Sequence, residues 1–259
     1  MNALHAIILG VVEGLTEFLP ISSTGHLIIT SHFLKLVQGD FLKTFEIAIQ
    51  VGAISAVLFV FTKKILTNYD LAFKTALAFI PTGIIGLLTY SYAKKYLLGN
   101  IEVVIWSLLV GGIIIILTEL YLRKKEPLPV ETEDTSVISW KSALLIGVFQ
   151  SIAVIPGVSR SGATIIGGLW LGISRKKIVE FSFLLALPTL VAATGLSLIK
   201  TSGGFNSDQW LLLFLGSVAS FITAILSIKF FLRYVEKHSF LYFGVYRIIL
   251  ALVLFSVIL

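Results

Sequence analysis

Residues 143–171 read ALLIGVFQSIAVIPGVSRSGATIIGGLWL, two short apolar segments separated by a break of small polar residues. The segments 143–155 and 164–171 are each about half as long as the roughly 20 apolar residues that a helix needs to cross a bilayer. Pro156 and the glycine beside it end the first helix and permit a turn. The pattern predicts a re-entrant helical hairpin, which is tolerated at membrane depth only where it is buried in protein or lines a wet cavity.

A second hairpin of this kind is predicted near the N-terminus. Its apolar segments are residues 4–12 and 27–36. The break between them holds Glu13-Gly-Leu-Thr-Glu17 and Pro20-Ile-Ser-Ser-Thr-Gly25. Proline and glycine again interrupt the helix, here beside two acidic residues and three hydroxyls.

The two hairpins share an order of residues that predicts an internal repeat. On one offset, Gly10-Val-Val-Glu-Gly falls on Gly147-Val-Phe-Gln-Ser, and Ile21-Ser-Ser-Thr-Gly falls on Val158-Ser-Arg-Ser-Gly. Three apolar segments follow each hairpin, at residues 45–61, 71–92 and 101–121, then at 179–199, 210–231 and 240–259. Three crossings turn the second copy upside down, so we expect the hairpins to enter from opposite faces and meet near the midplane.

The composition indicates a chain that is embedded in the membrane throughout. Of its 259 residues, 57% are hydrophobic and 13% charged, and the mean hydropathy is +0.99, which leaves no room for a separate soluble domain. We predict an all-α polytopic membrane protein with about six spanning helices and two re-entrant hairpins, related as an inverted-topology repeat. The single domain, 1–259, would comprise repeat 1 (about 1–122), a loop (about 123–139) and repeat 2 (about 140–259). The lack of cysteine excludes disulfides, thiol nucleophiles and thiolate metal sites.

Basic residues between the predicted spans indicate the orientation. They gather at residues 63–64, 123–141, 175–177 and 233–237, and are fewer on the opposite side. The positive-inside rule makes the first side cytoplasmic, so both termini and the mouth of the first hairpin are expected outside. Topology therefore explains the net charge of +6 without binding to nucleic acid. The sequence leaves open whether the chain forms a homodimer.

Glu13 and Glu17 lie four residues apart, so a helix places both on one face, about one turn apart. Two carboxylates this close repel each other, and burial in an apolar segment raises that cost unless a cation or a proton is shared. The functional interpretation is a hard-cation site with oxygen ligands, or a general base. The alternative is a polar patch at the outer lipid boundary.

Hydroxyl and imidazole groups follow the two glutamates in the same hairpin. They belong to Ser22, Ser23, Thr24 and His26. Alone, the hydroxyls would form a helix N-cap, and the histidine would more often make a structural hydrogen bond. Their clustering with the two glutamates in one hairpin favours a catalytic site.

Arg160 stands in the break of the second hairpin, where a charge is costly in lipid without an anion. Its guanidinium is a rigid fork that suits phosphate. The hydroxyls of Ser159, Ser161 and Thr164, with the backbone N–H groups at the start of the next helix, would complete an anion cradle. The alternative is an ion pair with Glu17 across the hairpins, which need not exclude phosphate binding.

Other polar residues are expected to support this site. Glu46, Gln50, Gln150 and Glu180 are assigned to its lining or to capping the hairpins. Arg247 is expected to snorkel to the cytoplasmic interface.

These motifs resemble those of a known family. Glu13-Gly-Leu-Thr-Glu17, Ser22-Ser-Thr-Gly-His26 and Pro156-Gly-Val-Ser-Arg-Ser-Gly-Ala-Thr164 are similar to the signature motifs of the undecaprenyl-diphosphate phosphatases, the bacitracin-resistance protein family. The resemblance covers essentially the whole chain and departs at no motif position. It implies removal of the terminal phosphate from undecaprenyl diphosphate, which recycles the lipid carrier for cell-wall synthesis and confers bacitracin resistance. It also implies a divalent cation and a site open to the outer side of the bacterial cytoplasmic membrane.

The leading hypothesis is a lipid diphosphate phosphatase in which Arg160 holds the β-phosphate, while Glu13 and Glu17 hold Mg²⁺ or Ca²⁺. Three nucleophiles stay open: Ser23 with Glu17 or His26 as its base, His26 itself, or metal-bound water. The alternative function is a transporter or flippase of an anionic polyprenyl phosphate lipid, because inverted repeats with broken helices are common in transporters. A non-catalytic scaffold would leave the buried charges unexplained.

Overall fold

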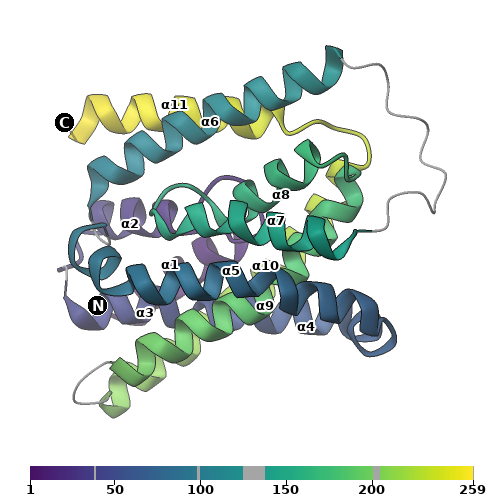
Figure 1. Ribbon diagram of the computed structural model, residues 1–259. Helices are drawn as coiled ribbons and strands as arrows, with labels where there is room; N and C mark the ends of the chain where they lie inside the picture. The colour runs from purple at the N-terminus through teal and green to yellow at the C-terminus, as the bar shows by residue number, and fades with distance from the viewer. Residues whose placement is uncertain (38, 98–99, 125–137, 201–204, 259) are drawn as a thin grey trace.

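The computed structural model describes residues 1–37, 39–97, 100–124, 138–200 and 205–258, and this part of the chain contains helices and no strands. The first half holds α1 (Ala3–Thr16), α2 (Ser23–Phe33), α3 (Asp40–Ala48), α4 (Gln50–Thr67), α5 (Tyr69–Tyr92), the π-helical turn η1 (Ala93–Leu97) and α6 (Ile101–Lys124) (Figure 1). The second half holds α7 (Trp140–Ser151), the 3₁₀ turn η2 (Ile152–Val154), α8 (Arg160–Trp170), α9 (Arg175–Lys200), α10 (Ser207–Val235) and α11 (Leu241–Ile258). Most of the predicted loop at 123–139 lies outside the described residues.

Five helices of the described part are long and apolar enough to cross a membrane. They are α3 and α4 taken together (Asp40–Thr67), α5, α6, α9 as far as Ser197, and α10. The sixth predicted span, at residues 240–259, corresponds to α11, whose segment Leu241–Ser256 is shorter than these five. The all-α polytopic fold is thus confirmed, with five of the six predicted spans reaching full length.

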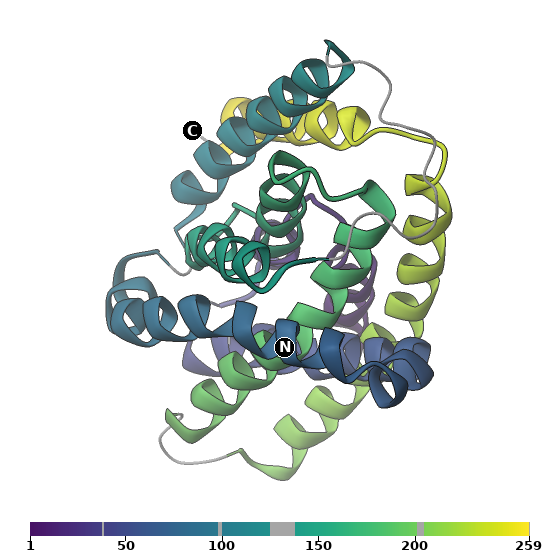
Figure 2. The same ribbon diagram turned by 45° about the vertical axis from the view of Figure 1, so that its right-hand side comes forward.

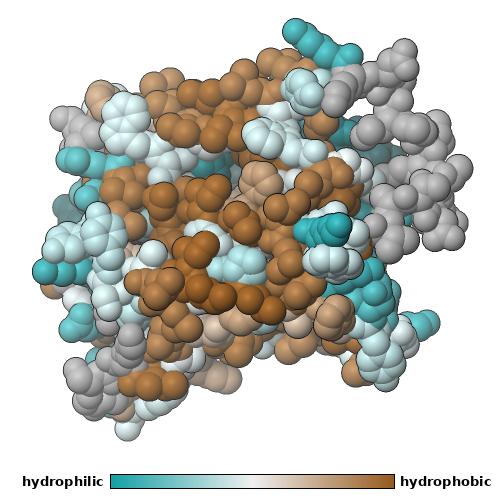
Figure 3. All heavy atoms as spheres, in the orientation of Figure 1, coloured by the Kyte–Doolittle hydropathy of each residue, from teal (hydrophilic) through white to brown (hydrophobic). Residues whose placement is uncertain are grey.

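The outside of the long helices is apolar. Phe59, Leu88, Phe214 and Leu226 lie on three of these helices, and each is at least 60% exposed. Figure 3 shows apolar side chains across the middle of one face, with hydrophilic ones gathered toward its left and right ends. Exposed apolar surface of this extent needs lipid around it. The chain is therefore a multi-pass membrane protein.

The two predicted hairpins are present as pairs of short helices. α1 packs against α2, and α7 packs against α8. In Figures 1 and 2 these four helices lie between α6 and α11 on one side and α4, α5 and α9 on the other. The breaks are shorter than predicted, because α1 continues to Thr16, α2 begins at Ser23 and α8 begins at Arg160. The small polar residues cap the second helices and so belong to their first turns.

Each hairpin packs against a long helix of the other half of the chain. α1 lies against α10, and α7 lies against α5. A Cβ atom on Gly10 would lie 2.2 Å from the carbonyl oxygen of Gly216, and one on Gly147 would lie 2.0 Å from that of Ala78. Alanine at either position would force the helices apart. Since Gly10 and Gly147 are aligned in sequence, their common role supports the predicted repeat.

Candidate active site

The two hairpin loops end in the same turn. Ser22 has φ 72° and ψ 95°, and Ser159 has φ 77° and ψ 114°. Each serine caps the following helix, because its Oγ accepts a hydrogen bond from the N–H of Gly25 (3.2 Å) or Gly162 (3.1 Å). A left-handed backbone is costly for serine and persists only where its surroundings impose it, as they often do at functional sites.

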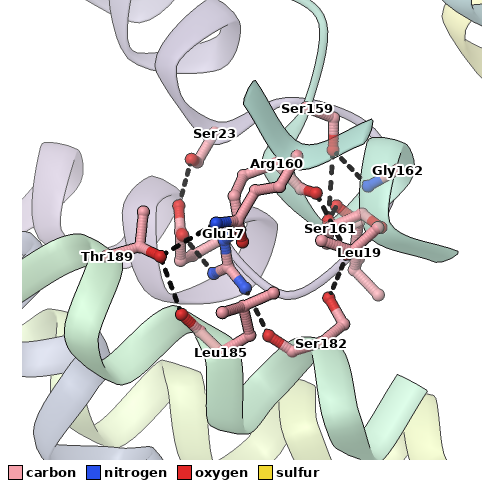
Figure 4. A network of polar contacts seen from close by, with 12 residues as sticks. Glu17, Leu19, Ser23, Ser159, Arg160, Ser161, Gly162, Ser182, Leu185 and Thr189 are labelled. Atoms are coloured by element: carbon pink, nitrogen blue, oxygen red, sulfur yellow. Dashed lines mark hydrogen bonds and ion pairs between the residues drawn. The ribbon is translucent and has the colours of Figure 1, made fainter. Parts of the chain in front are cut away.

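These turns bring the first residues of α2 and α8 to one carboxylate (Figure 4). The Oγ of Ser23 donates a hydrogen bond to Oε2 of Glu17. Arg160 donates from Nη2 to Oε1 of Glu17 at 2.6 Å, and from Nη1 to the carbonyl of Ser182 at 2.8 Å. Ser23 and Arg160 are aligned with each other in the sequences of the two hairpins, and Glu17 contacts both of them, so that it joins the two hairpins. The Arg160–Glu17 ion pair considered from the sequence is therefore present.

The surroundings of this cluster suit an anion. Glu17 is 6% exposed, and the fully buried ring of Phe18 lies 6.0 Å from Cζ of Arg160. The N-termini of α2 and α8 add the positive ends of two helix dipoles. No described residue accepts a hydrogen bond from the buried Nε–H of Arg160. This N–H is therefore available to a phosphate oxygen.

Like Ser22 and Ser159, which cap the helices, two more of the predicted phosphate-binding hydroxyls have protein partners. Ser161 Oγ donates to the carbonyl of Leu19 at 2.8 Å, which ties the second loop to the first. Thr164 Oγ1 lies 2.6 Å from Ser182 Oγ on α9 and also bonds within α8. The hydroxyls of Ser161 and Thr164 therefore hold the loops in place. Thr24, a further predicted phosphate-binding residue, is half-buried in the first turn of α2. The predicted anion cradle is therefore reduced mainly to Arg160 and the backbone N–H groups at the starts of α2 and α8.

Glu13 is a buried carboxylate without a donor. It is 0% exposed, and no described residue donates a hydrogen bond to either of its oxygens. Its acidic neighbours are Glu17 and Glu46. Its counterpart in the repeat, Gln150, is neutral and donates from Nε2 to Thr82 Oγ1 at 2.8 Å and to Thr189 Oγ1 at 3.0 Å. A buried carboxylate left this way requires a cation or a proton.

His26 bonds to Ser22 and Tyr246. Its Nδ1 lies 2.7 Å from the carbonyl oxygen of Ser22, to which only an N–H can donate. Its Nε2 lies 2.8 Å from the hydroxyl of Tyr246 on α11, and the two rings are stacked. In the neutral imidazole, Nδ1 therefore carries the proton and Nε2 accepts from Tyr246. Glu17, and not His26, is the group in contact with the Ser23 hydroxyl.

The other residues predicted to support the site, Glu46, Gln50 and Glu180, lie in different parts of the structure. Glu46 accepts a hydrogen bond from Ser31 Oγ at 2.5 Å, which links α3 to α2. Gln50 is buried at the start of α4. Glu180 forms an ion pair with Lys64, which joins α9 to α4. Glu180 therefore serves the packing of the long helices.

The prediction that Arg247 snorkels to the cytoplasmic interface is wrong. Arg247 is 0% exposed, and its guanidinium donates to the loops of both hairpins and to α6. Sequence reasoning also missed Tyr246. The partners of both residues come from distant parts of the chain, so no local pattern shows them. One feature of the sequence could have located Arg247. An arginine in the middle of an apolar helix is costly in lipid, which predicts that its side chain faces the protein interior.

The sequence is similar to those of known proteins over nearly its whole length. The chain matches the family described as "Bacitracin resistance protein BacA" over residues 6–253. It is 50% identical to the undecaprenyl-diphosphatase of Aquifex aeolicus over 253 residues, covering 98% of this chain and 97% of that protein. It is 47% identical to the undecaprenyl-diphosphatase of Wolinella succinogenes (98% and 97% covered) and 45% identical to that of Bdellovibrio bacteriovorus (98% and 95%). The chain therefore belongs to the BacA bacitracin-resistance family.

Proposed function

We propose that this chain hydrolyses undecaprenyl diphosphate to undecaprenyl phosphate and inorganic phosphate, which returns the lipid carrier to cell-wall synthesis and confers bacitracin resistance. The observation that carries the proposal is the contact of Ser23 and Arg160 with the two oxygens of Glu17. A hydroxyl, a base and a phosphate-binding guanidinium thus meet in one buried cluster. The full-length relatives reported above are named for this activity.

The cluster supports a two-step mechanism. The guanidinium of Arg160 and the N-termini of α2 and α8 hold the β-phosphate and offset its charge. Ser23 Oγ forms a bond to the β-phosphorus as Glu17 accepts its proton, and the bond from that phosphorus to the bridging oxygen breaks. Undecaprenyl phosphate leaves with the electron pair of that bond. Water then forms a bond to that phosphorus as the bond from the phosphorus to Ser23 Oγ breaks. Ser23 Oγ takes back the proton that Glu17 holds, and inorganic phosphate departs with the oxygen and the protons of the water.

The geometry favours Ser23 over the two other nucleophiles. The Ser23 hydroxyl already donates to Glu17, as a nucleophile activated by a base requires. Both nitrogens of His26 are occupied by Ser22 and Tyr246. His26 therefore supports the loop that carries Ser23. Direct attack by water, without a covalent intermediate, is the third alternative, and a rapid-quench experiment distinguishes it from attack by Ser23.

The donor set fits a divalent cation of the hard class, Mg²⁺ or Ca²⁺. The described residues hold no group of three or more His, Asp or Glu side chains arranged for a metal ion. Glu13 and Glu17 would supply two carboxylates, and substrate phosphate oxygens and water would supply the rest, as is common for Mg²⁺. The donor-free oxygens of Glu13 are the observation behind this assignment. When bound, the cation would neutralise charge on the diphosphate.

A detergent assay tests the function itself. Purified protein in detergent, given undecaprenyl diphosphate, is expected to release inorganic phosphate with many turnovers. Detergent offers no second compartment, so a transporter or flippase would release none. A preparation that is folded and binds the lipid but yields no phosphate would reject the enzymatic proposal.

Replacing Glu13 tests the cation. Glu13→Gln is expected to lower kcat by about 10²-fold and to raise the Mg²⁺ or Ca²⁺ concentration needed for half-maximal rate, because a neutral amide is a poorer ligand. Chelator should silence the wild type, and added cation should restore it. Gln150→Glu, at the aligned position of the other hairpin, is the matched comparison. It should not raise the Mg²⁺ or Ca²⁺ concentration needed for half-maximal rate. Full wild-type activity in chelator would remove the metal and leave the glutamates as acid–base groups.

The proposed location is the bacterial cytoplasmic membrane, with the site facing outward and both termini outside. Accessibility reporters at residue 1, at residue 259 and within the 123–139 loop are expected to report outside, outside and inside, because basic segments stay in the cytoplasm. Termini on opposite faces would contradict the inverted repeat.

A further inference from the structure

Arg247, in the middle of α11, hydrogen-bonds to three segments that are far from it in the sequence, which are α6 and the two hairpin loops. Its side chain is fully buried. All five of its guanidinium N–H groups meet backbone carbonyls: Nε donates to Leu108 (3.3 Å), Nη1 to Pro20 (3.2 Å) and Val158 (3.0 Å), and Nη2 to Ser107 (2.8 Å) and Gly157 (2.9 Å). Three of these carbonyls belong to the two hairpin loops, and two belong to α6. One side chain thus holds both loops against one helix.

The chain makes room for this guanidinium. A Cβ atom on Gly111 of α6 would lie 2.1 Å from Nη2 of Arg247. Glycine at this position therefore lets the guanidinium reach the carbonyls. The acceptors of Arg247 are all neutral, so its charge is met by carbonyl dipoles and not by a carboxylate. Five acceptors match the five N–H donors of arginine, and no other side chain has as many.

We propose that Arg247 is a positioning residue that fixes the spacing of the two hairpin loops, and thereby sets the Ser23 hydroxyl against the Arg160 guanidinium. This inference rests on the proposed function. Pro20 lies three residues before Ser23, and Val158 lies two residues before Arg160, so the loop carbonyls held by Arg247 are close in sequence to both groups. Within the described part of the chain, the hydrogen bonds of the Arg247 guanidinium all go to backbone carbonyls.

Arg247→Lys tests the inference through a split between kcat and KM. An ammonium group keeps the charge but has three donors, so it cannot hold five carbonyls. A small shift of the loops should lower kcat by about 10²-fold. KM should change less than about threefold, because Arg160 and the helix N-termini still bind phosphate. A residue that served folding alone would lower the amount of folded protein and leave kcat per folded molecule at the wild-type value.

A cross-link measures the loop spacing without any assay of activity. A Cβ atom on Gly162 would lie 3.7 Å from Cβ of Pro20, which is within the range of disulfides, about 3.5–4.5 Å. The chain has no cysteine of its own, so the pair Pro20→Cys and Gly162→Cys gives no competing disulfides. The pair should close about tenfold more slowly when Arg247→Lys is added, because the effective concentration of the thiols falls as the loops separate. In that background, the oxidised protein should also have a higher kcat than the same protein reduced.

Gly111→Ala provides a second route if Arg247→Lys fails to fold. The added methyl should displace the guanidinium and reproduce both effects while Arg247 stays in place. Gly86→Ala is the matched control, because a Cβ atom there meets nothing within 4 Å. Wild-type kcat in folded Arg247→Lys or Gly111→Ala protein, or an unchanged rate of disulfide closure, would overturn the inference. Absence of phosphatase activity in the wild type would instead reject the proposed function, and the closure rates would still report on the loops.

Discussion

Ser23→Ala is expected to reduce kcat by about 10³-fold or more, because it removes the attacking oxygen while leaving the phosphate cradle in place. KM should stay close to the wild-type value, since Arg160 and the N-termini of α2 and α8 still bind the diphosphate. Steady-state release of inorganic phosphate measures both constants. Ser55→Ala is the control, because the one hydrogen bond of the Ser55 hydroxyl within the described part of the chain goes to the Val51 carbonyl of its own helix.

The same measurement on His26→Ala separates the nucleophiles. Loss of the His26–Tyr246 contact should loosen the loop that carries Ser23 and reduce kcat by about tenfold. If His26→Ala is instead the more damaging change, and Ser23→Ala keeps near-normal turnover, then His26 is the nucleophile and Ser23 only binds phosphate.

Arg160→Lys is expected to lower kcat/KM by about 10³-fold, nearly as much as Arg160→Ala, because arginine contacts that offset charge in phosphoryl transfer have effects of this size. Lysine keeps the charge but lacks the fork that reaches Glu17, the Ser182 carbonyl and a phosphate oxygen together. The measurement is kcat/KM for phosphate release, with Arg233→Lys on the exposed end of α10 as the control.

Thermal unfolding distinguishes loss of phosphate binding from loss of structure. Arg160→Ala leaves Glu17 buried without its ion pair, which should cost about 3–5 kcal/mol of the free energy of unfolding. Arg160→Lys keeps a positive charge near Glu17 and should cost less. A lysine variant with near-normal kcat/KM would show that the charge alone suffices, and the role given to the guanidinium fork would then be wrong.

Much of the fold follows from local sequence patterns. The long apolar runs identified the spanning helices, and Pro20, Gly25, Pro156 and Gly157 marked the breaks of the hairpins. The same patterns predicted that Glu17 and Ser23 of the first hairpin lie close to Arg160 of the second. This worked because the repeat requires the two breaks to meet, and because buried charges need partners.

The remaining parts of the site depend on distant contacts. No local pattern places Tyr246 against His26, or Arg247 against carbonyls of both loops. Sequence also could not tell that Ser161 binds the Leu19 carbonyl, since a hydroxyl in a loop suits a ligand or a neighbouring backbone equally well. Such assignments need the relative placement of helices that are far apart in the chain.

The nucleophile is the central claim, and rapid acid quench with substrate labelled on the β-phosphate tests it most directly. The label should appear in an acid-stable phosphoserine at Ser23 before inorganic phosphate accumulates, and should be absent from Ser23→Ala. An acid-labile, base-stable adduct on His26 would contradict the account, and so would the absence of any adduct in wild-type protein and in a variant with slowed turnover, which would assign the attack to water.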